Sequence, residues 1–479
     1  MKDFRALLAG KNLSFFIRTY GCQMNERDSE KMAGLLEQIG FVAAKSKDVA
    51  DIVIYNTCCV RESAEDKVFG HLSREKSAKA QRPFILAIGG CMPQQPEMAD
   101  LLREKHKYAD IVFGTGNRHR LPEFLWRVIE NGERNIVDIT EGENELPEIT
   151  DVPVTTREFS HKAGVNIMYG CDNFCSYCIV PYVRGREKSR AAEDVLAEIR
   201  ALADDGVREI MLLGQNVNSY RGKICESVRV VSLPAPTLQN DSLASFPELL
   251  HLAHEVEGIK RIRFMTSHPK DFSDELIDAM QKLPNVCKHV HLPLQAGSTR
   301  VLADMNRFYT KEQYLALAEK LYAAMPEIAI TTDIIVGYPG ETDEDFEDTL
   351  DVVRRVRFAG AFTFIYSKRS GTPAATRTDL IPRKTANERF DRLTAELYPI
   401  MTARNESKIG QIIDVMVEEV RDDASNAYKA RGDDHTLVHF TAETGEFVAG
   451  DIVPVRIDVA KTFYVSGCAA SDFLRKSCN

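Results

Sequence analysis

The sequence predicts an α/β protein in three parts: an N-terminal Rossmann-like parallel α/β domain, a central partial (β/α)6 TIM-like barrel, and a small all-β C-terminal barrel of the OB type. Apolar strand-like runs alternate with helical segments along most of the chain, six such units succeed one another in its middle, and short strands with polar turns follow Pro399. Because 479 residues are too many for one hydrophobic core, we expect several domains. The expected boundaries are 1–138 for the N-terminal domain, 139–162 for a linker, 163–397 for the barrel, 398–470 for the β domain and 471–479 for a tail.

Composition and charge are those of a globular protein. The chain has 44% hydrophobic and 28% charged residues, its start lacks the pattern of a signal peptide, and it has no run of about 18 apolar residues. We therefore expect a cytoplasmic protein without a membrane partner. The net charge of −10 argues against non-specific coating of nucleic acid, which needs a cationic face. The basic segment from Arg354 to Lys408 fits a solvated helical face and a phosphate-binding surface equally well.

Near the N-terminus, three short apolar runs each end in a turn that carries a cysteine. The runs and their cysteines are Leu13–Thr19 with Cys22, Asp51–Tyr55 with Cys58, and Phe84–Ile88 with Cys91. Helical patterns follow two of the runs, one capped by Asn25 and ending near Ile39, the other over Arg61–Lys79. This alternation predicts a parallel sheet, whose ligand sites lie beyond the carboxyl ends of its strands, where all three cysteines fall.

The positions of these cysteines leave two interpretations open. Three turn cysteines can be buried packing residues, or they can be metal ligands, which a helix N-terminus after each would favour by stabilising the thiolate. Cys59 adjoins Cys58, so one of the two side chains must point away. We expect Cys58 to be the ligand and Cys59 to be a packing residue or a spare thiol.

The central barrel is expected after an acidic, irregular stretch with Pro147 and Pro153, which we interpret as the linker. Its strand candidates are Val165–Met168, Glu209–Leu213, Arg261–Met265, Val290–Pro293, Ile330–Val336 and Ala361–Tyr366. In such barrels the chemistry lies at the carboxyl ends of the strands. Lys223–Ser245, with its prolines and polar residues, predicts a long surface excursion.

The C-terminal pattern predicts a small β module. Its strand candidates are Ile412–Val420, Ala427–Gly432, Thr436–Phe440 and Asp451–Val459. Modules of this type often bind single-stranded or looped nucleic acid, although a fold alone does not establish a function.

Cys171, Cys175 and Cys178 share one short loop directly after the first predicted barrel strand. Three thiolates on one loop can hold three corners of a cubane 4Fe–4S cluster and leave its fourth iron for a small molecule. That iron can bind the amino and carboxylate groups of S-adenosylmethionine, so that the reduced cluster delivers an electron to the sulfonium. A zinc site would more naturally use paired cysteines or added histidines, and this loop has no histidine.

Several motifs, taken in chain order, resemble the methylthiotransferase family. They are Thr19–Asn25, Asn56–Cys58, Gly89–Cys91, Cys171–Cys178, Gly214–Tyr220, Thr266–Pro269, His291–Gln295 and Asp333–Thr342. The resemblance covers almost the whole chain and implies an N-terminal cluster domain, a radical S-adenosylmethionine barrel and a C-terminal TRAM domain. The chain departs from the family pattern at Cys59, at Ala296 and in the Lys223–Ser245 excursion.

Within that family, the segments Thr19–Asn25 and Asp28–Glu30 are similar to the branch that acts on isopentenylated adenosine beside the anticodon of tRNA. The resemblance implies two 4Fe–4S clusters, one on Cys171, Cys175 and Cys178 and an auxiliary one on Cys22, Cys58 and Cys91. It also implies that one S-adenosylmethionine gives a methyl group to sulfur at the auxiliary cluster, while another yields the 5′-deoxyadenosyl radical that removes hydrogen from C2 of the adenine. The alternatives are the branches acting on threonylcarbamoyl-adenosine in tRNA or on a ribosomal-protein aspartate.

Polar residues near the cysteine loop and at predicted strand ends are candidates for contact with S-adenosylmethionine or the target nucleoside. Arg184, Arg186, Lys188 and Arg190 could hold the carboxylate of S-adenosylmethionine or a tRNA phosphate, although a basic surface turn explains them equally well. The remaining candidates are Tyr177, Gly214, Gln215, Asn216, Ser267, Gln295 and Asp333. We expect tRNA and an electron donor such as flavodoxin or ferredoxin as partners, and a monomeric chain.

Overall fold

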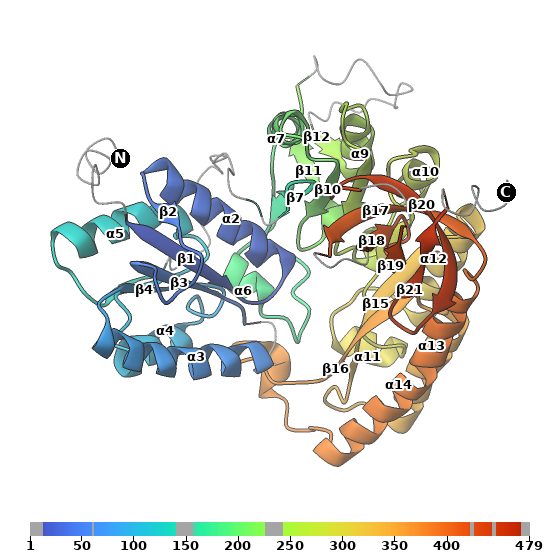
Figure 1. The fold of residues 1–479 in the computed structure, drawn as a ribbon. Helices are drawn as coiled ribbons and strands as arrows, with labels where there is room; N and C mark the ends of the chain where they lie inside the picture. The colour runs from blue at the N-terminus through green and yellow to red at the C-terminus, as the bar shows by residue number, and fades with distance from the viewer. Residues whose placement is uncertain are drawn as a thin grey trace.

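The computed structural model describes residues 13–59, 62–139, 157, 159–225, 243–421, 426–442 and 447–470. Figure 1 shows an N-terminal sheet with its helices, a central set of strands with its own helices, and a C-terminal β-barrel. This arrangement confirms the predicted fold class, whereas the domain boundaries stay predictions. The predicted tail and most of the predicted linker lie outside the described residues. No helix of the described part is both long and apolar enough to cross a membrane.

The N-terminal domain is built on a six-stranded parallel sheet in the order β2-β1-β3-β4-β5-β6. The strands are β1 Ser14–Thr19, β2 Val42–Ala43, β3 Ile52–Thr57, β4 Ile85–Gly90, β5 Ile111–Phe113 and β6 Ile136–Asp138. The helices are α2 Gln23–Gln38, α3 Glu62–Gln81, α4 Pro96–Lys105 and α5 Leu121–Glu130. The three predicted strands are confirmed, while β2, β5 and β6 are too short for an apolar pattern to predict.

The predicted cap of the first helix is wrong. Cys22 occupies the N-cap position of α2, and Asn25 lies inside its first turn. The side-chain amide of Asn25 instead donates hydrogen bonds to the carbonyl oxygens of Tyr20 (2.8 Å) and Thr57 (2.9 Å). Asn25 therefore connects the loops after β1 and β3, a tertiary contact that a local capping pattern does not reveal.

The central part is an incomplete barrel of two three-stranded parallel sheets. The first has the order β13 (Arg261–Phe264), β10 (Glu209–Leu213), β7 (Lys162–Asn166), and the second β14 (His289–His291), β15 (Ala329–Val336), β16 (Gly360–Ile365). A parallel bridge joins Ile262 of β13 to Val286, just before β14, whereas β7 and β16 do not pair with each other in the described part of the chain. The predicted six-stranded partial barrel is thus confirmed, with its open seam between β7 and β16.

Helices and short strands complete this central part. The helices are α6 Val180–Arg184, α7 Ala192–Asp204, α9 Phe246–His254, α10 Asp274–Lys282, α11 Thr299–Asp304, α12 Lys311–Ala324, α13 Asp343–Val356 and α14 Arg383–Glu406. The antiparallel pair β11 (Arg221–Lys223) and β12 (Leu243–Ser245) stands at the two ends of the predicted excursion, whose residues 226–242 lie outside the described part.

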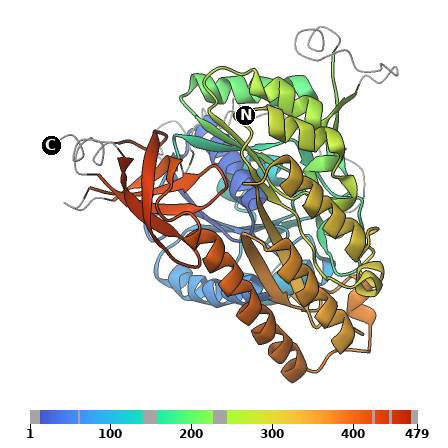
Figure 2. The ribbon, with the colours of Figure 1, turned by 90° about the vertical axis from the view of Figure 1, so that its right-hand side faces the viewer.

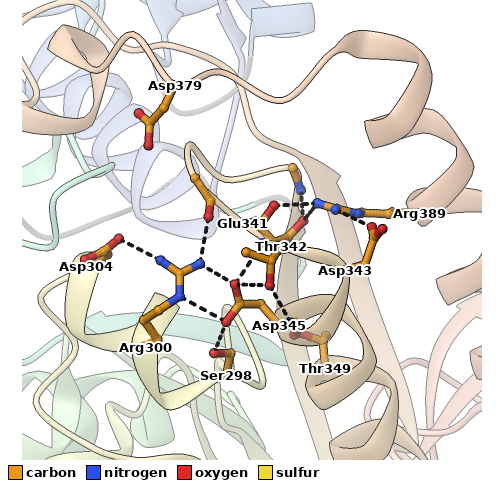
Figure 3. Close-up of polar contacts among 12 residues, drawn as sticks. Ser298, Arg300, Asp304, Glu341, Thr342, Asp343, Asp345, Thr349, Asp379 and Arg389 are labelled. Atoms are coloured by element: carbon orange, nitrogen blue, oxygen red, sulfur yellow. Dashed lines mark hydrogen bonds and ion pairs between the residues drawn. The ribbon is translucent and has the colours of Figure 1, made fainter.

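A polar network fastens the loop that follows β15. Figure 3 shows Arg300 of α11 against Asp345 in the first turn of α13, and Arg389 of α14 against Glu341. Glu341 also accepts a hydrogen bond from the backbone N–H of Gly337 at 2.8 Å. Because charged groups from three helices converge on this loop, its shape is fixed at the carboxyl end of the strand.

The C-terminal part is a closed five-stranded barrel in the order β17-β18-β19-β21-β20. Its strands are β17 Ile412–Val420, β18 Ala427–Gly432, β19 Leu437–Thr441, β20 Ile452–Ala460 and β21 Val465–Ala469. Figure 2 shows this barrel at the end of the long helix α14, which continues through Pro399. The four predicted strands are confirmed, but β21 is not foreseen because Ser466 and Gly467 interrupt any apolar alternation.

Candidate active site

The loop with Cys171, Cys175 and Cys178 follows the short strand β8 (Met168–Tyr169) and leads into α6. Cys171 and Cys175 are buried, and Cys178 is partly exposed. Gly170, just before the loop, has a φ of +69°, and a Cβ at this position would lie 2.0 Å from the carbonyl oxygen of Arg186. Only glycine allows the chain to turn into the loop at this point.

A neighbouring loop clamps the cysteine loop. Asn306 donates hydrogen bonds to the carbonyl oxygens of Asn173 (3.1 Å) and Phe174 (3.0 Å). Phe174 and Asn306 both have positive φ, 45° and 59°, a strained conformation that tends to persist at functional sites. The hydroxyl of Ser176 lies 2.8 Å from that of Tyr338, in the fastened loop after β15. The cysteine loop is therefore held from two sides.

Two side chains donate hydrogen bonds to the sulfurs of this loop. Arg307 Nη1 lies 3.3 Å from Cys175 Sγ, and Asn173 Nδ2 lies 3.4 Å from Cys171 Sγ. Burial raises the pKa of Cys171 to about 11 and that of Cys178 to about 12, so the free thiols are neutral at physiological pH. A bound cluster would displace these protons, and the two donors would then stabilise the negative sulfurs. This donor set fits an iron–sulfur cluster, and sequence spacing does not indicate Arg307.

Cys22, Cys58 and Cys91 follow β1, β3 and β4, which are neighbours in the N-terminal sheet. The carboxyl ends of these strands lie at the same edge of the sheet. Gly21 has a φ of +111°, and a Cβ there would lie 2.4 Å from the Cβ of Cys58. The fold thus brings the three cysteines into one neighbourhood, with Cys22 exposed and the other two buried.

The spare cysteine is also part of this neighbourhood. Cys59 is fully buried and shares a small apolar cluster with Cys91, Ile179 and Val183. A hydrogen bond with Cys59 is the main cause that lowers the pKa of Cys91 to about 6, and the Arg184 guanidinium also lowers it, against the effect of burial. Which of the two adjacent cysteines is a ligand therefore stays a prediction.

Arg184 lies at the N-terminal cysteines and not at the strand ends of the barrel. It donates hydrogen bonds to Asn25 Oδ1 (2.6 Å) and Asp28 Oδ2 (3.1 Å). Burial favours the neutral form of Asp28, but Arg118, Arg184 and Lys31 hold its pKa below the ordinary value. The barrel therefore contributes a buried cation to the N-terminal site, and the expected contact of Arg184 with S-adenosylmethionine or phosphate gains no support from this geometry.

The two cysteine sites meet at α6. Ile179 follows Cys178 directly and packs with Val183 against the N-terminal cysteines, and Arg184 ends the helix beside them. Among the described residues, no three His, Cys, Asp or Glu side chains converge closely enough to share one metal ion. One short helix separates the two sets of thiols.

The residues predicted to contact a ligand at the end of β10 form contacts with other parts of the fold. Gln215 Nε2 lies 2.9 Å from the sulfur of Met24 in α2, and Asn216 Nδ2 donates to Asp271 Oδ2 at 2.7 Å. A Cβ at Gly214 would lie 2.5 Å from Met168 Cγ, which explains the glycine by close packing. These residues shape the rim of the barrel.

Polar atoms at the end of β13 are buried but have no protein partner. Ser267 Oγ and His268 Nε2 lack a hydrogen bond within the described part of the chain. Burial lowers the pKa of His268 to about 2, so its ring is neutral. A buried polar atom without a partner costs free energy unless a ligand supplies one. This part of the rim therefore fits a polar ligand such as the nucleoside of S-adenosylmethionine.

Three further predicted contacts have other surroundings. Arg190 is buried and donates to Glu198 Oε2 at 2.5 Å and to the carbonyl oxygen of Asn166 at 2.7 Å, which is a structural role. Burial raises the pKa of Tyr177 well above its ordinary value. Gln295 has a φ of +67°, and its backbone N–H donates a hydrogen bond to the carbonyl oxygen of Asp333 at 2.8 Å. Their binding of a ligand stays a prediction.

Comparison with known proteins agrees with this geometry. The family model described as Radical SAM superfamily matches residues 165–353, and that described as Uncharacterized protein family UPF0004 matches residues 14–114. The solved structure of the radical S-adenosylmethionine methyltransferase TsrM from Kitasatospora setae has a TM-score of 0.54 at 16% identity, covering 76% of this chain and 77% of that one, which shows a similar fold. The barrel and its loop of three cysteines define a radical S-adenosylmethionine enzyme.

Relatives of known name are similar over almost the whole chain. The tRNA-2-methylthio-N(6)-dimethylallyladenosine synthase of Thermoanaerobacter sp. (strain X514) is 46% identical over 98% of this chain and 95% of its own length. The synthase of the same name from Lachnoclostridium phytofermentans is 47% identical over 96% of each chain. The chain belongs to the family of tRNA-2-methylthio-N(6)-dimethylallyladenosine synthases.

Proposed function

We propose that this protein adds a methylthio group to C2 of N6-isopentenyladenosine beside the anticodon of tRNA. The full-length identity to synthases of that name carries the proposal. The meeting of the two cysteine sites at α6 supports it, because the reaction needs a radical source and a sulfur donor close together.

In the barrel, Cys171, Cys175 and Cys178 would hold a 4Fe–4S cluster whose fourth iron is left for S-adenosylmethionine. When bound, this cluster supplies the electron that cleaves S-adenosylmethionine to the 5′-deoxyadenosyl radical. Arg307 and Asn173 donate hydrogen bonds to the sulfurs and so favour their ligating form. The unpartnered polar atoms at the end of β13 are suited to orient the bound nucleoside.

At the N-terminal site, Cys22, Cys58 and Cys91 would hold a second cluster, which would supply the sulfur that takes a methyl group from another S-adenosylmethionine and leaves S-adenosylhomocysteine. Arg184 places a buried positive charge beside these thiols, and the fixed cation offsets the charge of thiolate ligands. Asn25 joins the loop after β1 to the end of β3 through its hydrogen bonds to Tyr20 and Thr57.

The proposed tRNA surface includes the C-terminal barrel and the start of α14, where Lys384 is 89% exposed. Most cations between Arg354 and Lys408 are paired with acids, many of which lie outside that segment. The pairs are Arg354–Glu396, Arg355–Glu319, Arg377–Asp304, Lys384–Glu388, Arg389–Glu341, Arg392–Glu347 and Lys408–Asp434. Fewer of these cations are therefore available to bind phosphate than the number of basic residues in the segment suggests.

We further propose that a flavodoxin or ferredoxin reduces the barrel cluster and that the enzyme works as a cytoplasmic monomer. A one-electron reductant is required because S-adenosylmethionine is cleaved reductively. The proposed tRNA substrate supports the cytoplasmic location.

The test is an anaerobic reaction of the reconstituted protein with S-adenosylmethionine, a reductant and tRNA, followed by mass spectrometry of the tRNA nucleosides. Isopentenylated tRNA should give the 2-methylthio nucleoside, while the same tRNA without the isopentenyl group serves as the control. Product only with threonylcarbamoyl-adenosine tRNA, or only on a ribosomal-protein aspartate, would replace the proposal by one of those two activities.

A further inference from the structure

The inner face of the barrel is polar along β14 and the first half of β15, whereas Ile335 further along β15 packs with the apolar core. On β14 and β15, alternate residues such as Val290 and Ile330 belong to the core between the strands and the helices. The residues that alternate with these along the two strands, His291, Thr331 and Asp333, belong to no apolar cluster and lie on the opposite face of the sheet. Barrels of this type normally pack their interior with branched apolar residues, so a polar inner face marks a place for a ligand.

The polar groups of this face are joined in one chain. His289 Nε2 and His291 Nδ1 lie 2.9 and 3.1 Å from the hydroxyl of Thr331. The other ring nitrogen of His291, Nε2, lies 3.4 Å from Asp333 Oδ2. These contacts fix the orientation of the Asp333 carboxylate, which remains 27% exposed.

Phe362 stands beside this carboxylate on the edge strand β16. It is the register partner of Asp333, so the two side chains lie on the same face of the sheet. Its ring is 6.1 Å from that of His291 at an interplanar angle of 66°. Phe362 is 53% exposed. A single exposed phenylalanine is ordinary on a protein surface, but this one stands on the inner face of the barrel, next to a fixed carboxylate.

On the side of β7 and β10, a cavity lies between these strands, α2 and the C-terminal barrel. This cavity of about 230 Å³ is lined by Gly164 and Met211 of β7 and β10, together with Arg27 of α2 and Glu418 of β17. On β16, a Cβ at Gly360 would meet only Thr331, at 3.4 Å, so this inner position also leaves space. The inner face therefore has room for a ligand beside Thr331.

We propose that Phe362 is the stacking platform for the target adenine and that Asp333 accepts a hydrogen bond from its N6–H, with His291 acting as a positioning residue for Asp333. This inference rests on the proposed function. An N6-substituted adenine keeps one N–H donor and a flat face, and it must leave the anticodon loop to reach the inside of an enzyme. A base stacked on Phe362 would lie on the inner face beside Asp333, the fixed acceptor. Among the described residues, no other exposed aromatic side chain stands on a barrel strand next to such an acceptor.

The experiment measures the Michaelis constants for isopentenylated tRNA and for S-adenosylmethionine in Phe362→Ala, Phe362→Tyr and Asp333→Asn. Phe362→Ala should raise the constant for tRNA roughly ten- to a hundredfold, the effect of losing one base–aromatic stack, and should raise the ratio of 5′-deoxyadenosine to methylthiolated product. Phe362→Tyr keeps the ring and should restore the constant to within about threefold. Asp333→Asn should raise it by roughly tenfold, the loss of one charge-assisted hydrogen bond.

Iron content and thermal unfolding of each variant show whether it is folded and loaded. An unchanged Michaelis constant for tRNA and unchanged coupling in loaded Phe362→Ala would overturn the inference while leaving the proposed function intact. A raised constant for S-adenosylmethionine alone would assign Phe362 to the cofactor and overturn it as well. A wild-type enzyme that forms no methylthio nucleoside would instead remove the proposed function itself.

Discussion

The two cysteine sites differ in how the chain builds them. Cys171, Cys175 and Cys178 share one loop, whose sulfurs receive hydrogen bonds from Asn173 within the loop and from Arg307 next to it. The N-terminal site draws its cysteines from three loops that are far apart in sequence, and its cation, Arg184, comes from the barrel.

The two sites therefore depend on different parts of the fold. The barrel site needs its own loop and the residues that hold it, Asn306, Arg307 and Tyr338, all of which belong to the barrel. The N-terminal site needs the order of a parallel sheet and the contact between two domains, in which Arg184 meets Asp28 and Arg27 meets Glu198 at 2.5 Å. We therefore expect changes at the domain contact to affect the N-terminal site first.

The largest effect is expected from the triple variant Cys171→Ala, Cys175→Ala, Cys178→Ala. Reconstituted wild-type protein should hold about eight irons, since two cubane clusters need four each, and the variant about half of that. Without the barrel cluster, neither 5′-deoxyadenosine nor methylthiolated tRNA should form. Iron and sulfide analysis measures the first outcome and chromatography the second. A wild-type preparation that holds zinc and no labile sulfide would contradict the cluster assignment of both sites.

At the N-terminal site, Cys22→Ala, Cys58→Ala or Cys91→Ala should each abolish methylthio transfer while some release of 5′-deoxyadenosine persists, because the barrel site does not depend on them. Cys59→Ala is the matched variant and should remain active, although it shares an apolar cluster with Cys91. Loss of the N-terminal cluster in Cys59→Ala but not in Cys58→Ala would reverse the assignment of the ligand.

The domain contact is tested by Arg184→Gln. The change leaves the Asp28 carboxylate buried without one of its cations and should cost about 3–5 kcal/mol of folding free energy. Iron should be lost from the N-terminal site first, with the spectrum of the barrel cluster retained. Arg186→Gln, two residues away and 53% exposed, is the control; it loses only the exposed ion pair with Asp172 at 2.9 Å and should cost no more than about 1 kcal/mol. Equal loss of iron from both sites would show that they are not separately supported.

The smallest effect is expected at Glu418 of β17, in the contact between the C-terminal barrel and β7. Its carboxylate accepts hydrogen bonds from Arg431 Nε (3.0 Å) and Lys162 Nζ (3.1 Å), and although burial opposes them these partners lower its pKa to about 2. Glu418→Gln should cost about 1–3 kcal/mol at neutral pH. Neither cluster should change, and altered iron content would place this contact within the support of a cysteine site.

The pH dependence of the Glu418 contribution follows from the direction of that shift. The pKa in the folded protein lies below the ordinary 4.5, so the carboxylate stabilises the fold above about pH 4.5, and this contribution is lost as the pH falls towards about 2. The difference in thermal unfolding between wild-type and Glu418→Gln protein should therefore shrink between pH 4.5 and pH 2. A constant difference across that window would contradict the ion-pair explanation.

Much of the fold is predictable from the sequence because it depends on local periodicity. The long strands β1, β3, β4 and β17 appear where the apolar runs predict them, and the helix over Arg61–Lys79 is found as α3. The pattern does not reveal β2 or β5, which have two and three residues, or β21, in which Gly467 lies against the carbonyl oxygen of Arg456. Short strands are defined by their partners in the sheet and not by their own sequence.

For the candidate site, the sequence predicts the cysteine loop, the three turn cysteines and the rim residues, because ligand spacing and strand ends are local features of the chain. The contacts of Arg184 beside the N-terminal cysteines, of Asn25 between two loops and of Arg307 with Cys175 become visible only in the folded structure. The physical reason is that these contacts join segments whose separation along the chain carries no information about their distance in space. Sheet order and domain packing set that distance, and both arise only when the whole chain has folded.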